Sequence, residues 1–80
     1  MKIPRDLKGS DLVKALRKFG YGVSRQVVSH IMLTTQENGE HHVVVPNHNP
    51  LKVGTLNGIL GDVAEHFGIT KLELIVALFY

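Results

Sequence analysis

Hydrophobic residues near the start of the chain recur at the spacing of one helical face. The apolar positions on this face are Leu12, Val13, Leu16 and Phe19. Ser10 is a good N-cap residue, and Asp11 follows it in the first turn, where the helix dipole favours a negative charge. Gly20 suits the left-handed conformation that ends many helices. The pattern therefore predicts an amphipathic helix that begins after Ser10 and ends before Gly20.

The next part of the chain changes to short segments rich in β-branched residues, which are typical of strands. Residues 21–28 and 29–35 are predicted to form the first two strands. Asn38-Gly39 is a strong hairpin signal, because both residues tolerate positive φ angles. A third strand then runs from residue 40 or 41 to residue 45, antiparallel to the second. Pro46 ends it, because proline cannot donate a hydrogen bond to the sheet.

The last part of the chain returns to helical spacing. Thr55 is predicted to cap a helix that Gly68 closes. The apolar face of this helix consists of Leu56, Ile59, Leu60, Val63 and Phe67. Thr70-Lys71-Leu72-Glu73 has the pattern of a capping box for a short C-terminal helix. Because that helix is apolar nearly all round, we expect it to be buried or to cover a partner.

The predicted order is therefore α-β-β-β-α with an added short C-terminal helix, in a single domain that spans residues 1–80. Three antiparallel strands covered on one face by helices make an α+β two-layer sandwich, and a double-stranded-RNA-binding domain has the same order. Strand alternation places Ile31 and Leu33 on one face of the second strand and His30 on the other. If the aliphatic pair faces the helices, His30 points to the open face or its rim.

Composition and charge indicate the environment of the protein and the kind of partner it suits. The chain has no cysteine, so it forms neither disulfides nor thiolate metal sites, and it suits a reducing cytoplasm. No apolar run approaches the length of a membrane span. Residues 1–25 contain seven Lys or Arg and two Asp, a net charge of +5, whereas residues 26–80 carry −3. The basic part is suited to attract a polyanion, although a solvated basic face is the simpler alternative.

Histidine is the side-chain type that remains for chemistry. The sequence has no nucleophile motif, no distinctive carboxylate pair and no phosphate-cradling glycine loop after a strand. Histidine titrates near neutrality and suits proton transfer. RNA needs little more, because its 2′-hydroxyl attacks the neighbouring phosphorus once a base has taken the proton. Zinc binding by His30, His42 and His48 lacks a ligand-spacing signature, so no metal or other cofactor is predicted.

Several short motifs follow one another along almost the whole chain. They are Lys2-Ile3-Pro4-Arg5, Lys8-Gly9-Ser10, Phe19-Gly20-Tyr21, Arg25-Gln26, Ser29-His30, Val45-Pro46-x-His48 and Gly54-Thr55-Leu56-x-x-Ile59-Leu60. Each motif is weak alone, but their order and spacing resemble the HicA (YcfA-like) family, the RNA-cleaving toxins of bacterial toxin–antitoxin pairs. The resemblance implies a cytoplasmic toxin with the fold of a double-stranded-RNA-binding domain.

The resemblance also implies roles for individual residues. His30 would be the catalytic residue of a metal-independent endoribonuclease that cleaves mRNA, and Ser29 with the neighbouring backbone would help to place the phosphate. The predicted contacts to the RNA backbone are Arg25, Lys14, Lys18, His48 and Lys52. For His48, which precedes a helix N-terminus where anions bind readily, a turn residue bonded to local backbone is an equal alternative. A HicB-like antitoxin would cover the face that carries His30 and silence it.

Two departures from the family pattern leave other functions open. Val28 stands where the family has glycine, and its side chain narrows the approach of a phosphate to the backbone. Catalysis would then be weaker, differently posed or absent. Asn57 stands where many relatives carry a basic residue. The alternatives are a module of the same fold that binds RNA or a partner protein without cleavage, and a homo-oligomer held together by the C-terminal helix.

Overall fold

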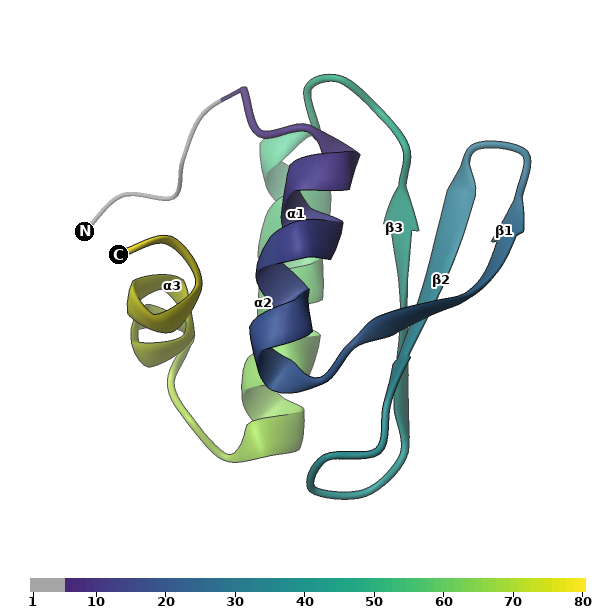
Figure 1. The fold of residues 1–80 in the computed structure, drawn as a ribbon. Helices are drawn as coiled ribbons and strands as arrows, with labels where there is room; N and C mark the ends of the chain where they lie inside the picture. Colours follow the sequence, from purple (N-terminus) through teal and green to yellow (C-terminus); the bar gives the residue numbers. More distant parts are fainter. Residues whose placement is uncertain (1–5) are drawn as a thin grey trace.

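The computed structural model describes residues 6–80, which form three helices, a short 3₁₀ turn and one antiparallel sheet (Figure 1). The elements are, in order, α1 (Gly9–Leu16), η1 (Arg17–Phe19), β1 (Gly22–Val27), β2 (His30–Thr35), β3 (His41–Pro46), α2 (Val53–Phe67) and α3 (Lys71–Phe79). This order confirms the predicted α+β arrangement and its additional C-terminal helix. The Lys2-Ile3-Pro4-Arg5 motif lies outside the described residues.

The strands lie in the order β1-β2-β3, so β2 is the central strand. Helices α1 and α2 cover one face of the sheet, and α3 packs on the far side of these helices (Figure 1). Ile31 and Leu33 of β2 are buried beneath the helices, whereas His30 and Met32 are exposed on the opposite face. The alternation predicted for β2 is therefore confirmed. We refer to the uncovered side of the sheet as the open face.

The core fills the space between the sheet and the helices. Its largest fully buried apolar side chains include Leu12, Leu16, Tyr21, Leu33, Leu56, Leu60 and Leu74. The predicted capping box of α3 is confirmed: the N–H of Thr70 donates to Glu73 at 2.9 Å, and the N–H of Glu73 donates to Oγ1 of Thr70 at 3.0 Å. None of the helices within residues 6–80 is long and apolar enough to cross a membrane.

Helix α1 begins earlier than the sequence predicts. Lys8, and not Ser10, is the N-cap residue, and Gly9 is the first helical residue. A tertiary contact explains the difference, because the N–H of Gly9 donates to the carbonyl oxygen of His48 at 2.9 Å. The two segments approach so closely that a Cβ at Gly9 would collide with the carbonyl oxygen of Pro46. The loop between β3 and α2 thus sets where α1 begins.

The other helix ends follow local signals to different degrees. Gly20 adopts the predicted left-handed conformation, with a φ of 82°, after η1. The predicted cap at Thr55 is wrong, because Lys52 is the N-cap residue of α2. Leu51, just before that helix, is buried, and its N–H donates to the carbonyl oxygen of Leu7 at 2.7 Å. This anchor holds the chain where α2 starts.

A two-residue turn joins β1 to β2. Val28 and Ser29 occupy this turn, so they do not belong to the strands predicted for them. Val28 has a φ of 55° and is 91% exposed. A β-branched residue rarely adopts this left-handed conformation, because its Cβ crowds the backbone. In the loop from β2 to β3, Asn38 and Gly39 have the predicted positive φ angles of 56° and 95°.

Strand β1 is exposed along its whole length, because it is an edge strand that runs away from the helices (Figure 1). Its pairing with β2 shifts register between Val23 and Arg25. A bulge of this kind bends a strand and re-aims its side chains. Here the hydroxyl of Ser24 donates a hydrogen bond to the carbonyl oxygen of Met32 in β2. Arg25 lies directly opposite Met32 in the strand pair.

Candidate functional site

His30 lies at the start of β2 on the open face, between Val27 of β1 and Pro46 of β3. Its side chain is exposed. Within residues 6–80, the ring of His30 makes neither a hydrogen bond nor an ion pair. A histidine with a structural role normally uses its ring nitrogens in hydrogen bonds to neighbouring groups. The ring of His30 is therefore available to a ligand from solvent.

His30 borders a shallow cavity on the open face, which we call the His30 hollow. Its volume is about 130 Å³, and it is lined by Arg25, Val27, His30, Met32 and Val44. The three apolar side chains form its floor, and each is between 37% and 48% exposed. Register explains the grouping, because Arg25, Met32 and Val44 lie side by side across the three strands. The sheet thus places one cationic side chain and one histidine beside an apolar depression.

Three other residues predicted to contact RNA lie near the same end of the sheet. Ser29 is in the turn before His30, and its carbonyl oxygen accepts a hydrogen bond from the N–H of Asn47 at 2.6 Å. This bond joins the turn to the loop that carries His48. His48 is exposed and its carbonyl oxygen is bonded to α1, while Lys52 is exposed at the start of α2. Packing therefore gathers the turn, this loop and the starts of α1 and α2.

The structure does not bring the predicted lysines of the first helix to His30. Lys14 is exposed on α1, on the helical side of the sheet. Lys18 reaches the C-terminal end of α3, where its ammonium group donates to the carbonyl oxygens of Leu78 at 3.0 Å and Ala77 at 3.4 Å. A cation at this position stabilises the negative end of a helix. Lys18 thus has a structural partner on the side away from the open face.

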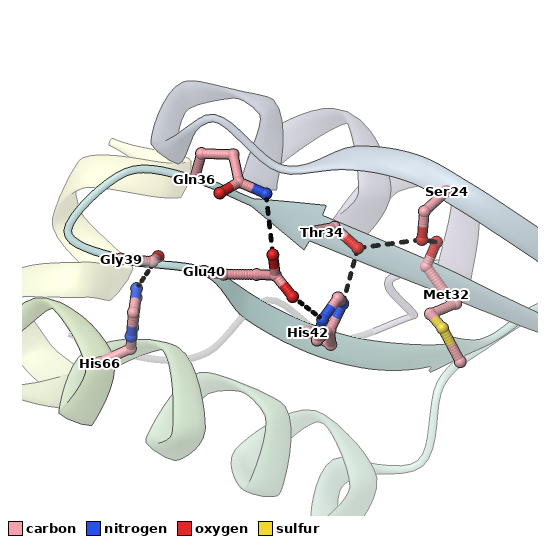
Figure 2. Close-up of polar contacts among 8 residues, drawn as sticks. All are labelled: Ser24, Met32, Thr34, Gln36, Gly39, Glu40, His42 and His66. Atoms are coloured by element: carbon pink, nitrogen blue, oxygen red, sulfur yellow. Dashed lines mark hydrogen bonds and ion pairs between the residues drawn. The ribbon is translucent and has the colours of Figure 1, made fainter.

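A chain of polar side chains crosses the other end of the open face (Figure 2). Nε2 of His42 lies 2.9 Å from Glu40, and its Nδ1 lies 2.7 Å from Oγ1 of Thr34. Thr34 donates in turn to Ser24 at 3.0 Å. The hydrogen bonds from His42 and then Gln36 lower the pKa of the Glu40 carboxyl. The pair of His42 with Glu40 joins residues two positions apart, whereas the contact of His42 with Thr34 crosses between strands and depends on their register.

A pair of histidines, His41 and His66, lies beside the loop between β2 and β3. The rings of His41 and His66 stack with centroids 4.4 Å apart. Nδ1 of His41 is 2.7 Å from the hydroxyl of Tyr21, whose pKa is raised to about 12 by burial and by Asp62. Burial, followed by the nearby His66, lowers the pKa of His41. These histidines serve the fold, since each has partners within it.

No group of three or more histidine or acidic side chains within residues 6–80 is arranged to hold a metal ion. The zinc ligands considered from the sequence are accordingly dispersed. His30 borders the His30 hollow, opposite Pro46 at the end of β3. His42 pairs with Glu40 near the start of β3. His48 lies in the loop that follows β3.

Fold and site together describe a small α+β protein with an exposed histidine on the open face of its sheet. A family model described as the HicA toxin of bacterial toxin–antitoxin matches residues 9–68, and the chain belongs to this HicA toxin family. Helix α3 lies beyond the matched segment. No curated protein and no solved structure matches the chain. Membership in a toxin–antitoxin family implies an antitoxin partner.

Proposed function

We propose that this protein is a metal-independent endoribonuclease that cleaves mRNA and uses His30 as its proton-transfer group. The observation that carries the proposal is the exposed, unengaged ring of His30 beside Arg25 in a member of the HicA toxin family. Histidine suits proton transfer at neutral pH, and a guanidinium group is well matched to a phosphate.

In this proposal His30 removes the proton from a 2′-hydroxyl of bound RNA. The 2′-oxygen attacks the adjacent phosphorus, and the bond to the 5′-oxygen of the next nucleotide breaks. That oxygen takes up a proton from water or from the protonated His30, so the products carry a 2′,3′-cyclic phosphate and a 5′-hydroxyl. Arg25 neutralises charge on the phosphate, and Ser29, His48 and Lys52 hold the RNA backbone at the same end of the sheet. Lys14 and Lys18 would contact only RNA that continues around to the helical side.

The partner in this proposal is a HicB-like antitoxin that silences the toxin by covering the open face. The open face around His30 combines a cationic side chain with exposed apolar ones. A surface of complementary shape and charge would exclude RNA from it. The expected result is that the purified antitoxin protects His30 from chemical modification by diethyl pyrocarbonate. Unchanged modification of His30 in the complex would contradict this mode of silencing.

The test of cleavage is incubation of the purified chain with a defined RNA in EDTA. We expect cleavage by the parent, cleavage reduced at least about 100-fold in His30→Ala, and normal cleavage in His42→Ala. His42 is the matched control, because it is also an exposed histidine of the open face but does not border the hollow. Circular dichroism verifies that each variant is folded. A 5′-phosphate on the downstream product, or equal cleavage by His30→Ala, would contradict the mechanism.

A non-catalytic RNA-binding or partner-binding module is the alternative function, and Val28 is the observation that favours it. Its side chain projects into solvent from the turn directly before Ser29-His30, where a phosphate would approach the backbone. A binding module would retard RNA in a gel without shortening it.

Self-association through α3 is a further proposal, since Leu72 and Val76 are exposed on this helix. Deletion of α3 is a poor test, because Leu74, Ile75 and Leu78 belong to the core. The pair of substitutions Leu72→Glu and Val76→Glu leaves the core intact. A lower mass for this variant than for the parent, measured by light scattering, would support the proposal, and an equal mass would contradict it.

A further inference from the structure

The His30 hollow has the size of one small ring. Its volume of about 130 Å³ is close to that of an engineered apolar cavity of about 150 Å³ that binds benzene. A six-membered ring therefore fits it, as the pyrimidine base of a nucleotide or the six-membered half of a purine.

The chemistry of the lining also suits a nucleobase. A base has flat faces that pack on apolar groups and polar edges that prefer water. The floor of Val27, Met32 and Val44 provides the apolar contact, and the methionine sulfur is polarisable and favours aromatic rings. Arg25 at the rim can stack on a base or hold its phosphate, as arginine does in many complexes with single-stranded RNA.

The position of the hollow relative to His30 matches the layout of a single nucleotide. His30 and Met32 are two residues apart on the same side of β2, which separates them by about 7 Å along the strand. A base seated over Met32 would thus leave its own ribose beside His30. Bases within a duplex are stacked and paired, and cannot enter such a depression without being pulled out.

We propose that the His30 hollow seats one unpaired nucleobase of single-stranded RNA and thereby presents the 2′-hydroxyl of that nucleotide to His30. This inference rests on the proposed ribonuclease function and names the form of RNA that the site accepts. A base must leave its stack to be seated, so loops and unpaired segments are the substrates and continuous duplexes are not.

The test is a binding cycle with probes that the protein cannot cleave. The probes are a single-stranded hexamer of 2′-deoxyuridine and a hexamer with the same sugar–phosphate backbone and no bases. The parent should bind the base-bearing hexamer roughly tenfold more tightly, which is the size of effect expected for stacking one base. The ratio of the two dissociation constants should fall to below about threefold in Met32→Ser, because this change removes the apolar floor.

Val23→Ser is the matched control. Val23 is another half-exposed apolar residue of the sheet, at 50% exposure, but it does not line the hollow. Its substitution should leave the ratio unchanged. A complementary strand covers the bases of the deoxyuridine hexamer. The parent should therefore bind the resulting duplex no more tightly than it binds the hexamer without bases.

Equal affinity of the parent for the two hexamers would overturn the inference, as would a ratio that Met32→Ser leaves intact. Tighter binding of the duplex would also overturn it. RNA cleavage is not measured in this cycle. The proposal of a base-binding hollow can therefore be refuted while the proposal of ribonuclease activity is unaffected. The seat can also be present in a protein that does not cleave.

Discussion

At the scale of single residues, the most unusual feature beside His30 is the backbone of the turn that precedes it. Val28 adopts a left-handed backbone conformation in the turn that leads into His30, although valine is among the residues least suited to it. Glycine adopts the same conformation without steric cost. The glycine that the family resemblance implies at this position would therefore have a backbone reason.

Replacement of Val28 by glycine should raise the free energy of unfolding by about 1 kcal/mol, because the cost of about 1–2 kcal/mol for a left-handed non-glycine residue is partly offset by the greater flexibility of unfolded glycine. Urea denaturation measures this change. Val27→Gly serves as the control and should destabilise, because Val27 is in a strand. If the chain is a ribonuclease, Val28→Gly should also cleave RNA faster. A loss of stability in Val28→Gly would contradict the argument.

At the scale of elements, side-chain contacts fasten the hairpin loop between β2 and β3 to helix α2. Nε2 of His66 lies 2.9 Å and 3.0 Å from the carbonyl oxygens of Glu37 and Gly39, and donates to them. Its ring stacks on His41, which in turn bonds to Tyr21. This arrangement favours a neutral His41, since burial and the neighbouring His66 both oppose its protonation.

Acidification should therefore destabilise this contact. The pKa of His41 in the folded chain is below the ordinary value of about 6.5, so the unfolded chain binds the proton first as the pH falls. The stabilisation is present above pH of about 6.5 and declines as the pH falls towards the folded pKa. We expect a smaller loss of stability between pH 6.5 and 5 in His41→Gln than in the parent, measured by urea denaturation. His42→Gln is the neighbouring control, and an unchanged profile in His41→Gln would contradict the prediction.

On the scale of the whole molecule, the helices divide the cationic residues between two sides. Arg25 borders the His30 hollow on the open face, whereas Lys14 lies on α1 and Lys18 bonds to the end of α3. The sequence places the basic residues together in its first part, but the fold separates them. The net charge of +2 therefore does not describe the surface around His30, where Arg25 is the cationic side chain that lines the hollow.

Neutralisation of these cations should consequently have unequal effects on RNA binding. Arg25→Gln should weaken binding and reduce the slope of log affinity against log salt by about 0.7, the value for one lost phosphate contact on a single strand. Lys14→Gln should have the smaller effect on a short single-stranded RNA, because Lys14 is on the helical side. Fluorescence anisotropy at several salt concentrations measures both, and equal effects would show that the RNA does not bind chiefly on the open face.

Features that depend on neighbouring residues could be predicted from the amino-acid sequence. Strand alternation predicted that Ile31 and Leu33 would lie on the face opposite to His30, and Asn38-Gly39 predicted the hairpin loop because both residues tolerate positive φ. The capping box at Thr70 is equally local. The motif pattern also identified the family. The alternation, the hairpin loop and the capping box follow from chemistry within a few residues along the chain, whereas the family follows from the order of motifs over almost its whole length.

Features that depend on packing between distant segments could not be predicted in this way and are visible only in the folded molecule. The contact of Gly9 with the β3–α2 loop set the start of α1, and pairing of the strands placed Val28 in a strained turn. The floor of the His30 hollow required the register of three strands, and the engagement of Lys18 required the docking of α3. Periodicity reports which side of an element is apolar. It carries no information about which element will cover that side or which side chains will meet there.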